Sequence, residues 1–144
     1  ATRITTADPV GEWRTHNEQL RLMKEKLNER RYAAVHFKGP GTDLKVGLAD
    51  AHKWDGGVSH TPQGNPFVAN MPTEEVFTAP HSQRVDGVVR ASMPLSYNGN
   101  LIDDFTLTFE GGKVVKAVAG KGQAVLDSIL DSDALGRGGA GASL

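Results

Sequence analysis

Cysteine is missing from the 144-residue sequence. Its absence excludes disulfide bonds, zinc sites built from thiolates and a cysteine nucleophile. It also fits a reducing compartment, so we expect a cytoplasmic location. An excess of charge of either sign is missing too, because 16 basic residues oppose 17 acidic ones. The charge balance therefore gives no reason to expect nucleic acid or an acidic membrane surface as a partner.

Long apolar runs are also lacking. No stretch approaches the roughly 20 apolar residues that a membrane helix needs, and no basic segment followed by an apolar one marks a signal peptide at the start. We therefore expect neither a membrane span nor a signal peptide. The sequence also lacks a His-Glu-x-x-His zinc motif, a Gly-x-Ser-x-Gly nucleophile motif and a phosphate-binding loop.

The order of hydrophobic periods predicts an α+β domain. Asp8-Pro9 suits a helix start, and apolar residues at helical spacing predict a helix over 9–30. Alternation predicts a mostly antiparallel sheet, and residues 50–73 are predicted to form a long irregular loop. The predicted sheet elements and last helix are a hairpin (33–37 with 44–48), a strand (84–91), a second hairpin (101–109 with 114–118) and a short helix (121–133).

The domain organisation predicted from these patterns is simple. Residues 8–133 are expected to form a single domain of ordinary size, which can bury about two-thirds of its unfolded surface. Residues 1–7 are expected to be a frayed start, and residues 134–144 a glycine-rich tail.

One short segment suggests chemistry. "NMPTEEVFTAP" (residues 70–80) places Glu74 and Glu75 between prolines and next to apolar residues. The plain interpretation is a solvated surface pair, or acidic residues in the first turn of a helix. The functional one is an inward-pointing carboxylate that binds a metal ion, since carboxylates are good ligands for zinc, cobalt, manganese or magnesium.

Partner ligands for such a metal are not evident from spacing. The five histidines (His16, His36, His52, His60 and His81) form no cluster at ligand spacing. His16 lies on the predicted long helix, where a satisfied surface role is favoured over metal ligation. The residues by themselves therefore offer one plausible ligand and no complete site.

The segment resembles a motif of the aminopeptidase T / aminopeptidase S family of bacterial metallo-aminopeptidases. The resemblance extends over residues 8–133. It is carried by "DPVGEWRTHNEQL" (8–20), "GPGTDLKVGLADAHKWDGG" (39–57), "RVDGVVRASMPL" (84–95) and "LTFEGGKVVKAVAGKGQAVLDSILDSD" (107–133). It implies an enzyme that removes N-terminal residues from peptide substrates, acts as a homodimer and holds two divalent metal ions, zinc or cobalt.

The same resemblance implies that Glu75 is a metal ligand, while the role of Glu74 stays open. This sequence also departs from the family's pattern at the next metal ligand. The family's next Glu ligand follows the helix that ends near Asp133, in a Leu-Gly-Glu sequence, whereas an ungapped register places Gly141 there. No segment matches the family's His, Tyr and Asp ligands, so we expect this chain not to form the metal centre alone. The alternative is a non-catalytic folded fragment or assembly domain without a complete metal site.

Overall fold

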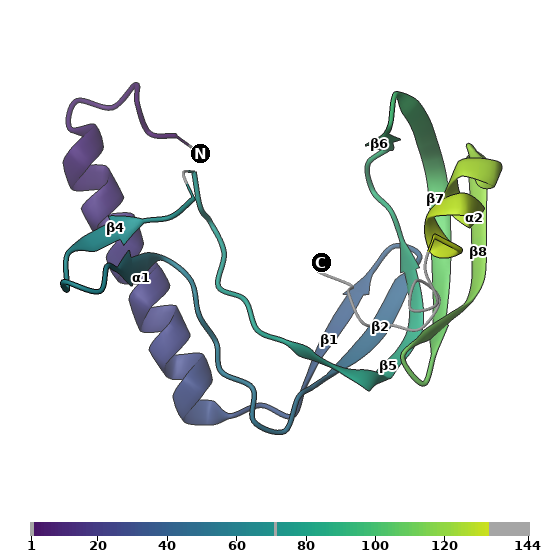
Figure 1. The fold of residues 1–144 in the computed structure, drawn as a ribbon, viewed down its shortest axis with the longest axis horizontal. Coiled ribbons are helices and arrows are strands. Elements are labelled where there is room, and N and C mark those ends of the chain that lie inside the picture. Colours follow the sequence, from purple (N-terminus) through teal and green to yellow (C-terminus); the bar gives the residue numbers. More distant parts are fainter. Residues whose placement is uncertain (1, 71, 133–144) are drawn as a thin grey trace. The chain divides into compact units, whose positions relative to one another are not determined.

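The structure is a computed structural model that describes residues 2–70 and 72–132. The described residues form one helix, eight strands and a second helix in that order (Figure 1). Contacts within the chain divide it into two compact units. Unit 1 comprises Ala1–Tyr32 and Ala51–Ala79, and unit 2 comprises Ala33–Asp50 and Pro80–Leu144.

The long helix α1 (Pro9–Arg30) is the main element of unit 1. The residues at its start explain why the helix begins there. Pro9 occupies the first turn, where it sacrifices no helical hydrogen bond, and the Asp8 carboxylate accepts from the backbone N–H of Gly11 at 2.9 Å. The predicted helix over residues 9–30 is confirmed.

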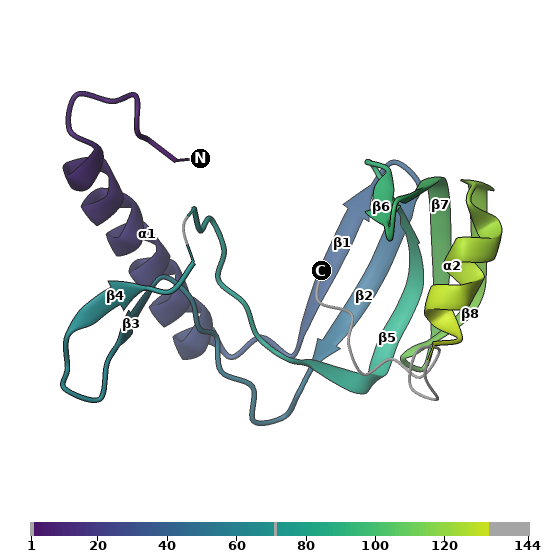
Figure 2. The same cartoon turned by 45° about the horizontal axis from the view of Figure 1, so that its top comes forward.

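One face of α1 supplies the small interior of unit 1. Trp13, His16 and Leu20 are buried at helical spacing, whereas Val10 and Met23 are 61% and 52% exposed. A short hairpin of β3 (Val58–His60) and β4 (Pro66–Val68) lies beside the helix (Figures 1 and 2). The apolar contact between α1 and the rest of unit 1 therefore rests on few side chains.

Unit 2 is built on an antiparallel sheet with the order β1-β2-β5-β7-β6, in which β8 also pairs with β7. β5 and β6 pair with opposite ends of β7, since Gly87–Arg90 face Thr106–Phe109 and Leu95–Tyr97 face Asn100–Ile102. The bounds of the strands are β1 (Ala34–Gly39), β2 (Thr42–Leu48), β5 (Pro80–Arg90), β6 (Leu95–Tyr97), β7 (Asn100–Glu110) and β8 (Lys113–Lys121).

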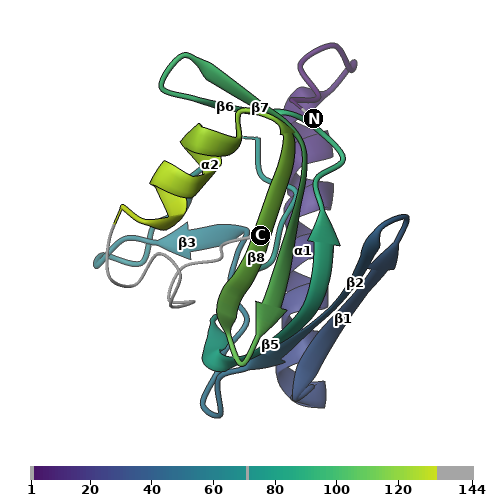
Figure 3. The ribbon, with the colours of Figure 1, turned by 90° about the vertical axis from the view of Figure 1, so that its right-hand side faces the viewer.

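The core of unit 2 lies between this sheet and the helix α2 (Gln123–Leu130). The helix contacts β7 and β8, as Figures 2 and 3 show. Ile102 and Leu44 are almost fully buried at 0% and 1% exposure. The buried core residues are Leu44, Val46, Val85, Ile102, Phe109, Val114, Leu126 and Leu130.

The structure confirms the predicted α+β class and both predicted hairpins. The prediction of an irregular loop over residues 50–73 is wrong in part, because β3 and β4 pair within it. The sequence also gave no sign of β6. That residues 8–133 form a single domain stays a prediction, and residues 134–144 lie outside the described part of the chain.

Candidate functional site

The backbone that follows the Glu74–Glu75 pair is held by contacts inside unit 1. Asp55 and Phe77 form a two-way bridge, with N···O distances of 2.9 and 2.8 Å. Just beyond it, the Thr78 hydroxyl donates to the carbonyl of Lys53 at 2.9 Å. The segment that carries the two carboxylates is thus anchored to residues 53–55 at its end.

The loop that holds this bridge is itself tied to α1. Asn28 exchanges two hydrogen bonds with the backbone of Trp54, at 2.9 and 2.8 Å. Lys24 donates to a carboxylate oxygen of Asp55 and to the carbonyl of Gly56, each at 3.2 Å. The long helix therefore fixes the loop, and the loop fixes the segment after Glu75.

Gly56 allows a close approach of the two backbones. A Cβ atom at this position would lie 2.7 Å from the carbonyl oxygen of Glu75 and 3.1 Å from Cα of Val76. Its φ of +135° is also one that side-chain-bearing residues rarely adopt. Any other residue here would push the backbone of Glu75 away from the loop.

The carboxylate of Glu74 contacts two side chains, those of Arg3 and His16. It lies 3.1 Å from Nη1 of Arg3 and 3.4 Å from Nε2 of His16. The hydrogen bond from the Arg3 guanidinium holds the pKa of Glu74 below its usual range. The first carboxylate of the pair therefore serves an internal contact.

Glu75 has different surroundings. Its side chain is exposed, and among the described residues it has no ion-pair partner. It lines a pocket of about 140 Å³ in unit 1. The other residues around the pocket are Asp55, Gly56, Gly57, Ser59, Ala69, Asn70, Thr73 and Phe77. Of the two adjacent glutamates, Glu75 is thus the one that lines this pocket.

Asp55 also lines the pocket, but its charge is already balanced. The backbone N–H of Gly56 and the Lys24 ammonium donate to its carboxylate, and these hydrogen bonds lower the pKa of Asp55. A cation entering the pocket would have to compete with Lys24 for Asp55. It would meet no such competitor at Glu75.

The burial of His16 was not predicted from the sequence. His16 is 7% exposed, and its Nε2 lies 2.7 Å from the carbonyl oxygen of Thr73. Its ring also meets that of Trp13 edge-on, with centroids 5.5 Å apart. The expected surface role is wrong, because this position of α1 faces the Glu74–Glu75 segment. Only the repeat of Trp13 and Leu20 around it hinted at burial.

The other histidines do not complete a metal site around Glu75. No group of three or more His, Cys, Asp or Glu side chains suited to a metal occurs within residues 2–70 and 72–132. His36 lies in unit 2, where it contacts Asp43 at 2.6 Å, and the Nδ1 of His81 accepts from the N–H of Gln83. The assignment of Glu75 as a metal ligand therefore stays a prediction. Helices of membrane-spanning length and apolarity are likewise not found among the described residues.

Comparison with known proteins assigns the sequence to a family. A family model described as thermophilic metalloprotease (M29) matches residues 1–138. The chain belongs to this family. Aminopeptidase T of Thermus aquaticus is 52% identical over 133 residues, which are 92% of this chain and 33% of that protein. Aminopeptidase AmpS of Bacillus subtilis is 47% identical over 133 residues and is covered to 32%.

A solved structure agrees with the sequence comparison. Wild-type AmpT from Thermus thermophilus matches with a TM-score of 0.86 and 50% identity, over 90% of this chain and 32% of that one. The resemblance to the aminopeptidase T / aminopeptidase S family is therefore confirmed. The M29 chain described here spans about a third of the length of these relatives.

Proposed function

We propose that this M29 chain is part of a metal-dependent aminopeptidase that removes N-terminal residues from peptides. The observation that carries the proposal is the match to proteins named aminopeptidase, at 46–52% identity over 92% of the chain. The pocket beside Glu75 supports it, because Glu75 lines the pocket without an ion-pair partner among the described residues, on a backbone that is held at Thr73 and at Phe77.

The carboxylate of Glu75 is suited to supply one ligand of a metal centre. Its oxygens are hard donors of the kind that zinc, cobalt and similar divalent ions accept. The described residues offer no second and third ligand beside it. We propose that the complete centre holds two divalent ions, zinc or cobalt, and that other residues supply its remaining ligands. Bound ions of this kind lower the pKa of water and polarise a peptide carbonyl.

Glu74 has a separate task in this proposal. Its contacts with Arg3 and His16 keep it beside α1 and the N-terminal segment. It balances the positive charge of Arg3 and leaves Glu75 as the only carboxylate of the pair that can serve the ion. Location in the cytoplasm and assembly as a homodimer complete the proposal. The absence of cysteine supports the first, and the family resemblance supports the second.

The test is substitution of the two carboxylates in the complete protein that carries these residues. Glu75→Ala should lose its cobalt- or zinc-dependent cleavage of an amino-acid p-nitroanilide and bind less metal. Glu74→Gln is the matched control, and its metal content should equal that of the wild type because Glu74 contacts Arg3 and His16 and does not line the pocket. Normal turnover and full metal content in Glu75→Ala would refute the assignment.

The second candidate is a folded domain with a structural or assembly role. The lack of a three-residue metal cluster in the described residues favours it, and the sheet of unit 2 ends in strands that could pair with another chain. Metal analysis of the purified 144-residue chain, followed by the same assay with added cobalt or zinc, separates the two. Tight stoichiometric metal with turnover favours the enzyme. A folded, metal-free and inert protein favours the assembly role.

A further inference from the structure

The buried histidine of α1 contacts Glu74, but the function proposed so far gives it no part at Glu75. His16 and Thr73 are the two buried polar residues among those described, and they contact each other. A carbonyl oxygen can only accept, so Nε2 of His16 must carry the hydrogen of this 2.7 Å contact. The bond thus joins the second turn of α1 to the backbone two residues before Glu75.

This bond has a counterpart on the other side of Glu75. Phe77, two residues after Glu75, exchanges both of its backbone hydrogen bonds with Asp55. The backbone around Glu75 therefore has one tether at Thr73 and another at Phe77. Between them, Gly56 packs against the carbonyl of Glu75 itself. The backbone is therefore confined at three alternate positions, while Glu75 itself is exposed and lines the pocket.

The two tethers differ in kind. The tether at Phe77 is a backbone bridge, which most side chains at these positions would preserve. The tether at Thr73 depends on one side chain, and the surroundings of His16 limit how it can turn. Trp13 meets the ring edge-on, Arg3 lies over Trp13 at 5.1 Å, and the indole N–H of Trp13 donates to the carbonyl of Thr2 at 2.9 Å.

We propose that His16 is a positioning residue for Glu75. Its hydrogen bond to the carbonyl of Thr73 holds the backbone in the conformation that keeps Glu75 at the pocket. The inference rests on the proposed role of Glu75 as a metal ligand. Groups that orient a ligand in this way typically change metal affinity by 10- to 100-fold when they are removed.

A pair of polar substitutions tests this directly. In His16→Gln the amide nitrogen can reach the place of Nε2 and donate to Thr73, whereas the shorter side chain of His16→Asn cannot. In the metal-free complete protein, amide exchange of the peptide that contains residues 73–77 should be as slow in His16→Gln as in the wild type. It should be at least about tenfold faster in His16→Asn, as loss of a side-chain tether allows local opening.

Binding of Co²⁺, followed by its visible absorption bands, provides the second measurement. His16→Asn should bind Co²⁺ about tenfold more weakly, and His16→Gln should restore most of the affinity. His60→Leu is the control for loss of a histidine in the same unit, since His60 is exposed on β3. Its exchange and affinity should match those of the wild type.

The outcomes separate the two proposals. Equal exchange rates and equal Co²⁺ affinity in His16→Asn and His16→Gln would overturn the positioning role. Wild-type affinity in Glu75→Gln would overturn the ligand assignment, whatever His16 does to the backbone. If Glu75→Gln loses Co²⁺ while both His16 variants keep it, the ligand assignment holds and the positioning role fails.

Discussion

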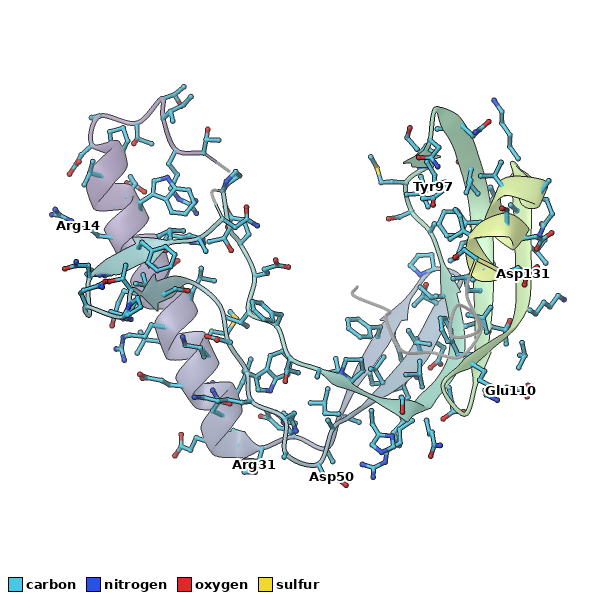
Figure 4. All side chains as sticks on the ribbon, viewed as in Figure 1. Arg14, Arg31, Asp50, Tyr97, Glu110 and Asp131 are labelled. Carbon is cyan, nitrogen blue, oxygen red and sulfur yellow. The ribbon has the colours of Figure 1, made fainter. Side chains whose placement is uncertain are left out.

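At the scale of single residues, Asp50 of unit 2 gives a pH prediction. Asp50 is labelled in Figure 4. Nη1 of Arg84 lies 2.7 Å from its carboxylate, and this hydrogen bond holds the pKa of Asp50 below its usual 3.8. A carboxyl with a lowered pKa in the folded state stabilises the fold above its ordinary pKa and stops doing so as the pH falls through the lowered value. Arg84→Leu should raise the pKa of Asp50 toward 3.8, as measured by NMR titration of its carboxyl carbon.

Asp43 is the internal control for this titration. The hydrogen bond from His36 lowers its pKa, and Arg84 is not among the causes. Its pKa should therefore be the same in Arg84→Leu and the wild type. The difference in stability between the two proteins should be present near neutral pH and vanish in acid. A pKa of Asp50 that does not move in Arg84→Leu would contradict the assigned cause.

The two glutamates show what the sequence could tell at this scale. The composition of residues 70–80 was enough to select the pair, because two adjacent carboxylates stand there between prolines and next to apolar residues. The composition could not show which glutamate makes an internal ion pair and which one lines the pocket. That division depends on Arg3, which is 71 positions away from Glu74 in the sequence. The burial of His16 was missed because an imidazole on a charged helix has the same sequence pattern whether or not a loop covers it.

At the scale of elements, the turn between β7 and β8 gives a stability prediction. Gly111 and Gly112 have φ angles of +54° and +81°, which suit a two-residue hairpin turn. A Cβ atom on Gly112 would collide with the carbonyl of Ser82 on β5, and the N–H of Gly112 donates to the carbonyl of Val85 at 2.9 Å. Gly112→Ala should therefore destabilise the protein by roughly 2–4 kcal/mol in urea unfolding.

Gly111→Ala is the matched control, one residue away in the same turn after Glu110 (Figure 4). Nothing lies within 4 Å of a Cβ atom at Gly111, so the substitution adds only the strain of the left-handed conformation. That strain costs about 1–2 kcal/mol. Equal losses for the two variants would show that the contact between the turn and β5 contributes nothing.

The elements that the sequence predicted are those with enough residues to display a period. α1 has 22 residues and β7 has 11, so both show their patterns over several repeats. The strands β3, β4 and β6 have three residues each, which is too short for an alternation to stand out. They form because neighbouring backbone is brought into register, and that information is not local.

At the scale of the whole molecule, family membership came from the order of motifs and not from any single residue. The segments quoted for the resemblance spread over residues 8–133, and the family model covers residues 1–138. The division into two units could not be read in the same way. Unit 1 is assembled from two stretches of sequence that flank β1 and β2, and no local pattern shows that these two stretches pack against each other.

The unequal cores of the two units lead to a prediction about local stability. Among the described residues, Trp13 and Leu20 are the buried hydrophobic ones of unit 1, whereas the buried cluster of unit 2 has eight members. Segments with fewer buried apolar contacts open with a lower free energy. In native-state hydrogen exchange, amides of α1 should therefore exchange faster than those of β2, β5 and β7.

Two matched leucine substitutions test whether this difference arises from the cores. Leu20 and Leu44 are 3% and 1% exposed, and Leu→Ala at such positions costs about 2–5 kcal/mol. Leu20→Ala should accelerate exchange in α1 and leave β7 unchanged, because the cavity weakens the interior of unit 1. Leu44→Ala should accelerate exchange in β2, β5 and β7. Equal acceleration of all these elements by Leu20→Ala would mean that the two units open together, and the thin interior around α1 would then not limit local stability.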